Sequence, residues 1–141
     1  MKRLNYLCLV GLLFVSAPSA VRGESLEWTR QLGASTTDFG YGVSADGLGN
    51  VYISGQTFGS LGGPSAGFED AYVSKYDAAG TLHWTRQLGT SWQDRSSGVS
   101  ADGLGNVYIS GYTTGSLGGP FGGRSYDAFV SKYDAAGTLQ W

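Results

Sequence analysis

The stretch that decides the fold is GVSADGLGNVYISG, which occupies residues 42–55 and returns letter for letter at residues 98–111. Three further stretches recur around it: WTRQLG at 28–33 and 84–89, GSLGGP at 59–64 and 115–120, and VSKYDAAGTL at 73–82 and 130–139. The offset is 56 residues and becomes 57 before the last stretch, because the second copy carries one extra residue. Close similarity at a fixed period indicates a repeat architecture.

Each repeat is predicted to form short strands joined by turns. In residues 51–54 the apolar Val51 and Ile53 alternate with Tyr52, as expected for a half-buried strand. The links at 46–50 and 77–80 combine an Asp with a Gly, which is typical of tight turns. The other expected strands are 42–45, 71–76 and 82–88, and the longer links are 34–41 and 58–69. No segment after the N-terminal region shows a helical period.

About four antiparallel strands per repeat predict an all-β fold built from β-propeller blades, each a four-stranded antiparallel meander. The run D-x-x-G-N-V-Y, followed by D-A-Y/F-V-x-K-Y-D-x-x-G-x-x-x-W, resembles the SBBP beta-propeller repeat of bacterial exported proteins. The resemblance covers both copies. It implies a propeller fold, placement at the cell surface or outside the cell, and repeat arrays of varied length. It implies no catalytic residues.

The chain holds about two blades. We expect residues 24–41 to be an orphan outer strand and loop, 42–97 a first repeat, and 98–141 a second repeat truncated in its outer strand. A propeller typically needs four to eight blades, because each blade covers its neighbour. We therefore expect a fragment of a larger propeller, and the alternative is that several copies assemble into a ring.

Residues 1–23 are predicted to be a secretory signal peptide. Lys2 and Arg3 precede an apolar run at 6–15, and small residues follow it. The run is shorter than the ~20 residues that span a bilayer, and an uncleaved signal anchor is the alternative. The possible cleavage points are Ser19, Ala20 and Gly23. The expected location is secreted or at the cell surface.

Removing this leader leaves an acidic chain without cysteine. The whole sequence has 9 basic and 11 acidic residues and a net charge of −2. Three of the basic residues and Cys8 lie in residues 1–23, so the mature chain carries a net charge of −5 and has no disulfide. No basic cluster remains for nucleic acid or for anionic lipid. We expect no nucleic-acid partner and no membrane insertion of the mature chain.

The two copies differ mainly in the longer links. Residues 34–41 correspond to 90–97, and residues 65–69 correspond to 121–126. Exposed aromatic and arginine side chains are good binding anchors, so we expect a protein or glycan ligand to meet this face. The alternative is unconstrained variation of surface loops. The candidate contacts are Phe39, Tyr41, Trp92, Arg95, Arg124 and Tyr126.

The sequence offers no catalytic, cofactor or metal site. The turn at 46–50 has oxygen ligands for calcium but lacks the other acidic positions of a calcium loop, which favours a structural turn. Asp38 and Asp94 are interpreted as caps of local turns. His83 is the only histidine, and without cysteine it forms neither a zinc site nor a nucleophile–base pair.

These observations predict an exported, non-enzymatic β-propeller repeat protein that acts as a surface scaffold or binding module. Its partners are an unknown protein or glycan, or further blades of the same fold. Two alternatives stay open. The chain is a fragment of a propeller-containing extracellular hydrolase or lyase, or it is a self-assembling structural repeat protein.

Overall fold

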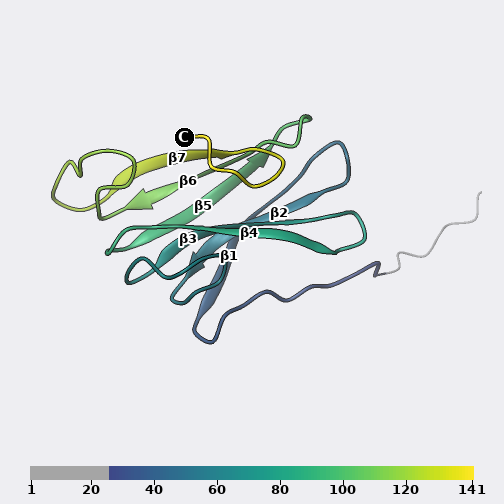
Figure 1. The fold of residues 1–141 in the computed structure, drawn as a ribbon, viewed down its shortest axis with the longest axis horizontal. Coiled ribbons are helices and arrows are strands. Elements are labelled where there is room, and N and C mark those ends of the chain that lie inside the picture. The colour runs from purple at the N-terminus through teal and green to yellow at the C-terminus, as the bar shows by residue number, and fades with distance from the viewer. Residues whose placement is uncertain (1–25) are drawn as a thin grey trace, which may run out of the picture.

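A computed structural model describes residues 26–141 and places them in two antiparallel sheets (Figure 1). The strands are β1 (Asp38–Ala45), β2 (Val51–Thr57), β3 (Asp70–Tyr76), β4 (Leu82–Leu88), β5 (Asp94–Ala101), β6 (Val107–Thr113) and β7 (Asp127–Tyr133). One sheet has the order β1-β2-β3-β4 and the other β5-β6-β7. We call them the first and second blade. The predicted all-β propeller meanders are confirmed, and the two sheets do not close into a ring.

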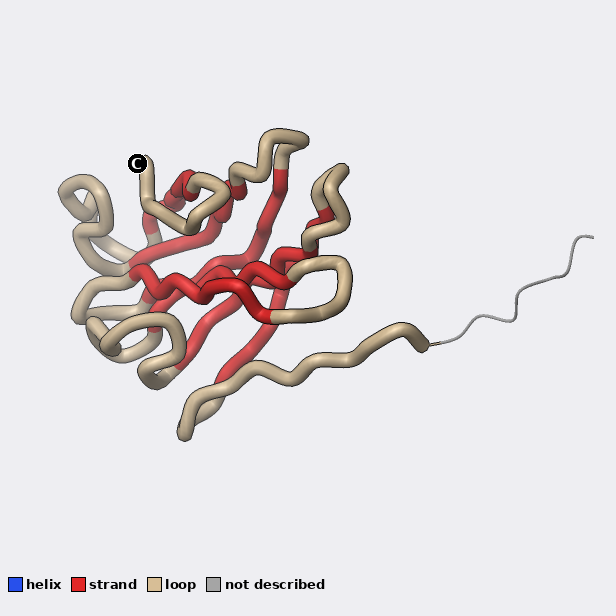
Figure 2. The backbone as a smooth tube through the Cα atoms, turned by 45° about the vertical axis from the view of Figure 1, so that its right-hand side comes forward, coloured by secondary structure: helices blue, strands red, loops and turns tan. Residues whose placement is uncertain are grey.

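Residues 26–141 contain strands and loops but no helix (Figure 2). In this part of the chain nothing therefore meets the length and apolarity that a membrane-spanning helix requires. The predicted signal peptide at residues 1–23 lies outside the described residues.

The strand register puts the two kinds of link at opposite ends of each blade. Ala45 pairs with Val51, Val51 with Tyr76, and Tyr76 with Leu82, so the tight turns 46–50 and 77–81 lie together. We call this the turn end. The long link 58–69 and the link 89–93 lie at the other end, which we call the loop end. This division agrees with the sequence prediction.

The first strand is longer than predicted. β1 begins at Asp38, so residues 38–41 belong to the sheet and not to the link 34–41. The register shifts between Gly40 and Gly42, which leaves Tyr41 as the extra residue of a β-bulge. A side chain at Gly55 would collide with the carbonyl oxygen of Phe39, so glycine is required opposite the bulge. The glycines around Tyr41 look like turn residues in the sequence, and this is why the prediction was wrong.

The second blade repeats the bulge. β5 begins at Asp94, and its register shifts between Ser96 and Gly98. Residues 94–97 were also predicted as loop and are strand. The connecting link is therefore only 89–93.

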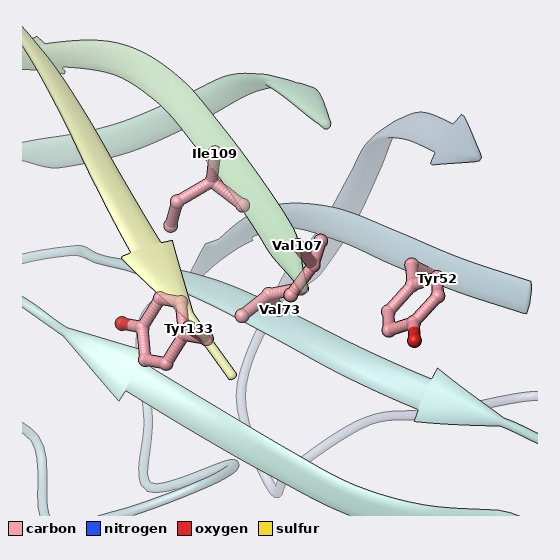
Figure 3. Close-up of a cluster of buried hydrophobic side chains, with 5 residues drawn as sticks. All are labelled: Tyr52, Val73, Val107, Ile109 and Tyr133. Carbon is pink, nitrogen blue, oxygen red and sulfur yellow. The ribbon is translucent and has the colours of Figure 1, made fainter. Parts of the chain in front are cut away.

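The core lies between the two blades (Figure 3). Tyr52 and Val73 project from the first blade, and Val107, Ile109 and Tyr133 project from the second. All five side chains are buried. The Tyr52 hydroxyl shares its hydrogen between Asp46 Oδ2 at 3.2 Å and the carbonyl oxygen of Gly105 at 3.3 Å, and the second contact joins the blades at the turn end. Burial of apolar surface between the sheets is the main force that holds them together.

A second contact joins the outer strand of one blade to a turn of the next. Trp84 Nε1 donates to the Ala135 carbonyl at 3.2 Å, and Arg86 Nε donates to the Gly137 carbonyl at 2.7 Å. We call Trp84 and Arg86 the Trp–Arg clamp. The contact runs from the outer strand of the first blade to a turn of the second blade, so the arrangement has a direction along the chain.

The segment at residues 26–33 makes the same contact with the first blade. Trp28 Nε1 donates to the Ala78 carbonyl at 3.1 Å, and Arg30 Nε donates to the Gly80 carbonyl at 2.7 Å. The segment was expected to be an outer strand, but it forms no ladder with any described strand. Trp28 and Arg30 nevertheless contact the first blade in the same way as Trp84 and Arg86 contact the second blade.

Candidate functional site

A row of aromatic rings around one arginine crosses the junction of the blades at the loop end. Phe39 and Tyr41 stack with 6.0 Å between their ring centroids. The Arg95 guanidinium lies 5.4 Å from the Tyr41 ring and 5.5 Å from the Tyr112 ring. Tyr126 meets Tyr112 edge to face at 4.7 Å. We call these five residues the aromatic–arginine ridge.

Four segments build the ridge. Phe39 and Tyr41 come from β1, Arg95 from β5 and Tyr112 from β6, while Tyr126 immediately precedes β7. The bulge redirects Tyr41 relative to a regular strand. The rings at the two ends remain open to water, with Phe39 44% and Tyr126 62% exposed. Exposed rings on a rigid sheet can bind a partner with little loss of side-chain entropy.

A buried polar pair supports the ridge from below. Gln56 and Glu69 are 1% and 2% exposed, and Gln56 Nε2 donates to Glu69 Oε2 at 2.7 Å. The Tyr41 hydroxyl donates to Gln56 Oε1 at 3.3 Å. Arg95 Nη2 lies 3.7 Å from Glu69 Oε1 in an ion pair. The chain of contacts fixes both Tyr41 and Arg95 relative to the sheet.

The same contacts cross from one blade to the other. The Asp94 amide donates to the Glu69 carbonyl oxygen at 2.8 Å, and Glu69 forms an isolated parallel bridge with Gln93. Glu69 precedes β3 of the first blade, whereas Arg95 is the second residue of β5 in the second blade. The site therefore depends on the docking of the two blades and exists in neither blade alone.

Two buried polar atoms beneath the ridge make no hydrogen bond within the protein. Arg95 Nε and Glu69 Oε1 are buried and have no hydrogen-bond partner. Unpaired buried polar atoms are costly unless something satisfies them. Burial raises the pKa of Tyr112, with Arg95 acting in the opposite direction. The Tyr112 phenol therefore stays protonated at neutral pH and can donate a hydrogen bond.

The two copies differ where the ridge is built. Phe39 corresponds to Arg95, and Gln56 corresponds to Tyr112. Tyr41 and Glu69 are matched by Ser97 and Tyr126 in the second blade. The turn end, by contrast, is identical in both copies over residues 42–55 and 98–111. The residues that differ between the copies thus gather at the loop end, whereas the identical residues extend to the turn end.

Four of the six predicted contact residues come together in the ridge. They are Phe39, Tyr41, Arg95 and Tyr126. The other two, Trp92 and Arg124, line a hollow beside it. The prediction missed Gln56, Glu69 and Tyr112 as members of the site. Comparison of the copies at 56 and 112 contained the signal, because the identical run ends one residue earlier.

The turn aspartates use their oxygens within the protein. Asp46 Oδ1 accepts the amides of Leu48 and Asn50, each at 2.9 Å. Its Oδ2 accepts the Asn50 side-chain amide at 2.7 Å and the Tyr52 hydroxyl at 3.2 Å. These bonds lower the pKa of Asp46, although burial opposes them. Within residues 26–141 no group of three or more potential metal-ligating side chains occurs. The geometry is that of a structural turn.

The loop-end aspartates act as local caps, as interpreted from the sequence. Asp38 Oδ2 accepts the Ala34 amide at 2.7 Å, and Asp94 Oδ2 accepts the Thr90 amide at 2.6 Å. His83 lies at the turn end, where its Nε2 is 3.2 Å from Asp77 Oδ2 and its side chain is 50% exposed. The histidine is thus at the opposite end of the blade from the ridge.

Comparison with known proteins identifies the repeat. A family model described as SBBP beta-propeller repeat matches residues 27–63 and 83–118, more than half of the chain. The regulatory protein FlaEY of Caulobacter vibrioides is 37% identical over 127 residues, which cover 82% of this chain and 13% of that protein. An uncharacterized WD repeat-containing protein of Acanthamoeba polyphaga mimivirus is 26% identical over 143 residues, covering 81% and 10%. The chain thus spans about a tenth of the length of these relatives. Its repeats, its sheets and the match together show that it belongs to the SBBP beta-propeller repeat family.

Proposed function

We propose that this chain is an exported, non-enzymatic β-propeller repeat protein that serves as a binding module or surface scaffold. Its ligand meets the loop end at the aromatic–arginine ridge. One observation carries the proposal: the copies are identical at the turn end but differ at the positions that converge on Arg95. Binding residues commonly sit on loops that a rigid scaffold positions.

The use of the carboxylates supports a binding role over catalysis. An acid–base pair needs carboxylates that face a shared substrate position. Asp46 and Asp77 accept hydrogen bonds within their own turns, and Asp38 and Asp94 cap the links at the loop end. Glu69 is held by Gln56 and Arg95 beneath the ridge. Each of these carboxylates is thus engaged in a contact that supports the fold.

Export is supported by the sequence of residues 1–23. The basic start, the apolar run and the small residues form a secretory leader. A test is to sequence the N-terminus of the chain recovered from the medium or the cell surface. We expect the mature protein to start after Ser19, Ala20 or Gly23. An intact Met1 on a chain retained inside the cell would contradict export.

The binding role is tested on intact cells of the organism that carries the gene. Labelled full-length chain is incubated with the cells, and the retained label is compared with that of an R95A/Y126A variant. We expect at least a tenfold loss of retention, since the variant removes the centre and one end of the ridge. Circular dichroism establishes that the variant keeps its sheets.

The matched control is His83→Gln, which introduces the residue found at the corresponding position, Gln140. His83 lies at the turn end, so this variant is expected to bind like the natural chain. Equal retention of the natural chain and the ridge variant would overturn the proposed function.

A further inference from the structure

The second blade has a hollow beside the ridge that is built from residues peculiar to that blade. Its volume is about 420 Å³. It is lined by Trp92, Thr114, Phe121, Arg124 and Ser125. Four of these residues correspond to Thr36, Phe58, Ser65 and Phe68 of the first blade, and Arg124 lies in the link that carries the extra residue. The volume is within the range of about 300–1,000 Å³ that small-ligand sites have.

The hollow lies where two aromatic rings have been lost. In the first blade Phe58 and Phe68 pack edge to face with 6.0 Å between ring centroids. The second blade has Thr114 and Ser125 at the same positions. The short side chains leave open the space that two phenyl rings occupy in the first blade. Trp92 and Phe121 then replace Thr36 and Ser65 at its edge.

Arg124 is held in a conformation that costs stability. Its φ is 113°, and it is the non-glycine residue with positive φ within residues 26–141. Glycine would adopt this conformation without strain, and Gly123 beside it has a φ of 78°. In the described part of the chain the Arg124 side chain makes neither a hydrogen bond nor an ion pair. Residues held in such a strained backbone conformation cluster at binding and active sites.

The lining of the hollow defines the chemistry of that ligand. Trp92 is 63% exposed and offers a flat apolar face, on which the C–H face of a sugar ring can stack. Ser125 adds an exposed hydroxyl, and a guanidinium binds a carboxylate through two parallel hydrogen bonds. No acidic side chain lines the hollow. The charge and shape suit a small, flat, anionic ring better than a protein surface, which needs about 800 Å² on each partner.

We propose that this hollow binds a uronic acid residue of an acidic polysaccharide. The ring stacks on Trp92, and its carboxylate pairs with Arg124. The proposal rests on the proposed function, because it names the ligand class that a binding module with this loop end would take. It also places the sugar next to the ridge, where neighbouring units of the same polysaccharide can contact Tyr126.

Calorimetric titration of the full chain tests the proposal with three probes. They are a trimer of α-1,4-linked galacturonate, a trimer containing glucuronate, and the methyl ester of the first trimer. We expect at least one acidic trimer to bind, and to bind at least tenfold more tightly than the ester. Binding of neither acidic trimer, or equal binding of acid and ester, overturns the proposal.

Two variants separate the site from the fold. R124G is expected to weaken uronate binding at least tenfold while the melting temperature stays the same or rises, because glycine relieves the strain. T114F/S125F restores the aromatic pair of the first blade, and we expect it to abolish binding although Trp92 and Arg124 remain. If T114F/S125F fails to fold, R124G alone decides. Uronate binding that R124G leaves unchanged contradicts the assignment.

The first blade provides a matched control. F58T/F68S opens the equivalent space there, but without a tryptophan or an arginine at its edge. We expect this variant to gain no second uronate site. If the acidic trimers fail while R95A/Y126A still loses retention on cells, the ligand class is wrong and the proposed function stands.

Discussion

Single carboxylates lock the tight turns of both blades. Asp77 Oδ1 accepts the amides of Ala79 and Thr81, at 2.9 and 2.8 Å. Asp102 Oδ1 accepts the amides of Leu104 and Asn106, each at 2.9 Å. The Thr81 amide, and after it His83, lowers the pKa of Asp77. The Asn106 side chain lowers the pKa of Asp102, with burial in opposition. The ionised form of each carboxylate is thus the one that the fold prefers.

The lowered pKa values predict loss of stability in acid. A carboxylate whose pKa is depressed by folding stabilises the protein fully above its unfolded pKa, here 3.8. That contribution disappears as the pH falls through the lower folded value. We expect the urea midpoint to be nearly constant from about pH 7 to about pH 5 and to fall below about pH 4. Equilibrium unfolding at several pH values measures it.

The variant D102A is the control for the acid effect. It removes one of the titrating groups, so its midpoint should already be lower at pH 7 and should fall less on acidification. An identical pH profile for D102A and the natural chain would show that Asp102 does not contribute to the transition.

At the scale of the elements, the Trp–Arg clamp explains why the last residue of each DAAG turn is glycine. Gly137 has a φ of 78°, and a Cβ there would lie 2.8 Å from Trp84 Cδ2. Gly80 has a φ of 75° and stands in the same relation to Trp28. Glycine at this position therefore does two things: it allows the left-handed turn and admits the indole ring of the clamp.

We expect G137A to lower the free energy of unfolding by about 1–3 kcal/mol, through backbone strain and displacement of Trp84. The control is G103A. Gly103 lies in a tight turn of the same blade, but a Cβ there would meet nothing within 4 Å, and its φ is not positive. Denaturant unfolding followed by tryptophan fluorescence compares the two. If G103A lowered the free energy of unfolding as much as G137A does, contact with the Trp–Arg clamp would not be the cause of the loss.

The elements also show what the sequence could and could not predict. Alternation at Val51, Tyr52 and Ile53 predicted a strand, and the Asp–Gly pairs predicted the turns correctly. The bulge at Tyr41 was missed, because the need for Gly40 and Gly42 arises from the partner strand. Local patterns report local geometry, whereas a bulge is defined only by pairing.

At the scale of the whole molecule, identical residues have different environments in the two blades. Tyr52 is fully buried, whereas its counterpart Tyr108 is half-buried. Conversely, Ile109 is 1% exposed, while Ile53 is only half-buried. The face of the first blade that carries Tyr52 packs against the second blade. The second blade contributes its opposite face, the one that carries Ile109. The sequence of one repeat does not predict which face of its sheet is buried, because burial depends on which face the neighbouring blade covers.

The same limit applies to the candidate site. Comparison of the copies located the loop end and named Phe39, Tyr41, Arg95 and Tyr126. The ion pair between Arg95 and Glu69 joins residues from different blades, so its existence depends on how the blades dock. Sequence patterns therefore predicted which side chains lie at the loop end but not the polar support beneath them.

The asymmetry between the blades gives a prediction with its own control. I109A should cost about 2–5 kcal/mol, since it leaves a cavity in the buried core between the sheets. I53A makes the same change at the matching position but on a half-buried face, and it should cost clearly less. Chemical denaturation of both variants measures the difference. Equal losses would mean that the contact between the blades contributes little to stability.

The separation of the two ends has a consequence for engineering. The clamp, the turns and the core tie the blades together, and at the loop end Glu69 adds a bridge to Gln93 and an ion pair with Arg95. Only the tip of a link at the loop end, for example residues 63–66, can therefore be treated as an exchangeable cassette, because Gly67 abuts the backbone of Ser91 and Glu69 joins the two blades. A chain with several such blades would present a programmable series of recognition loops, each chosen independently of the frame that carries it.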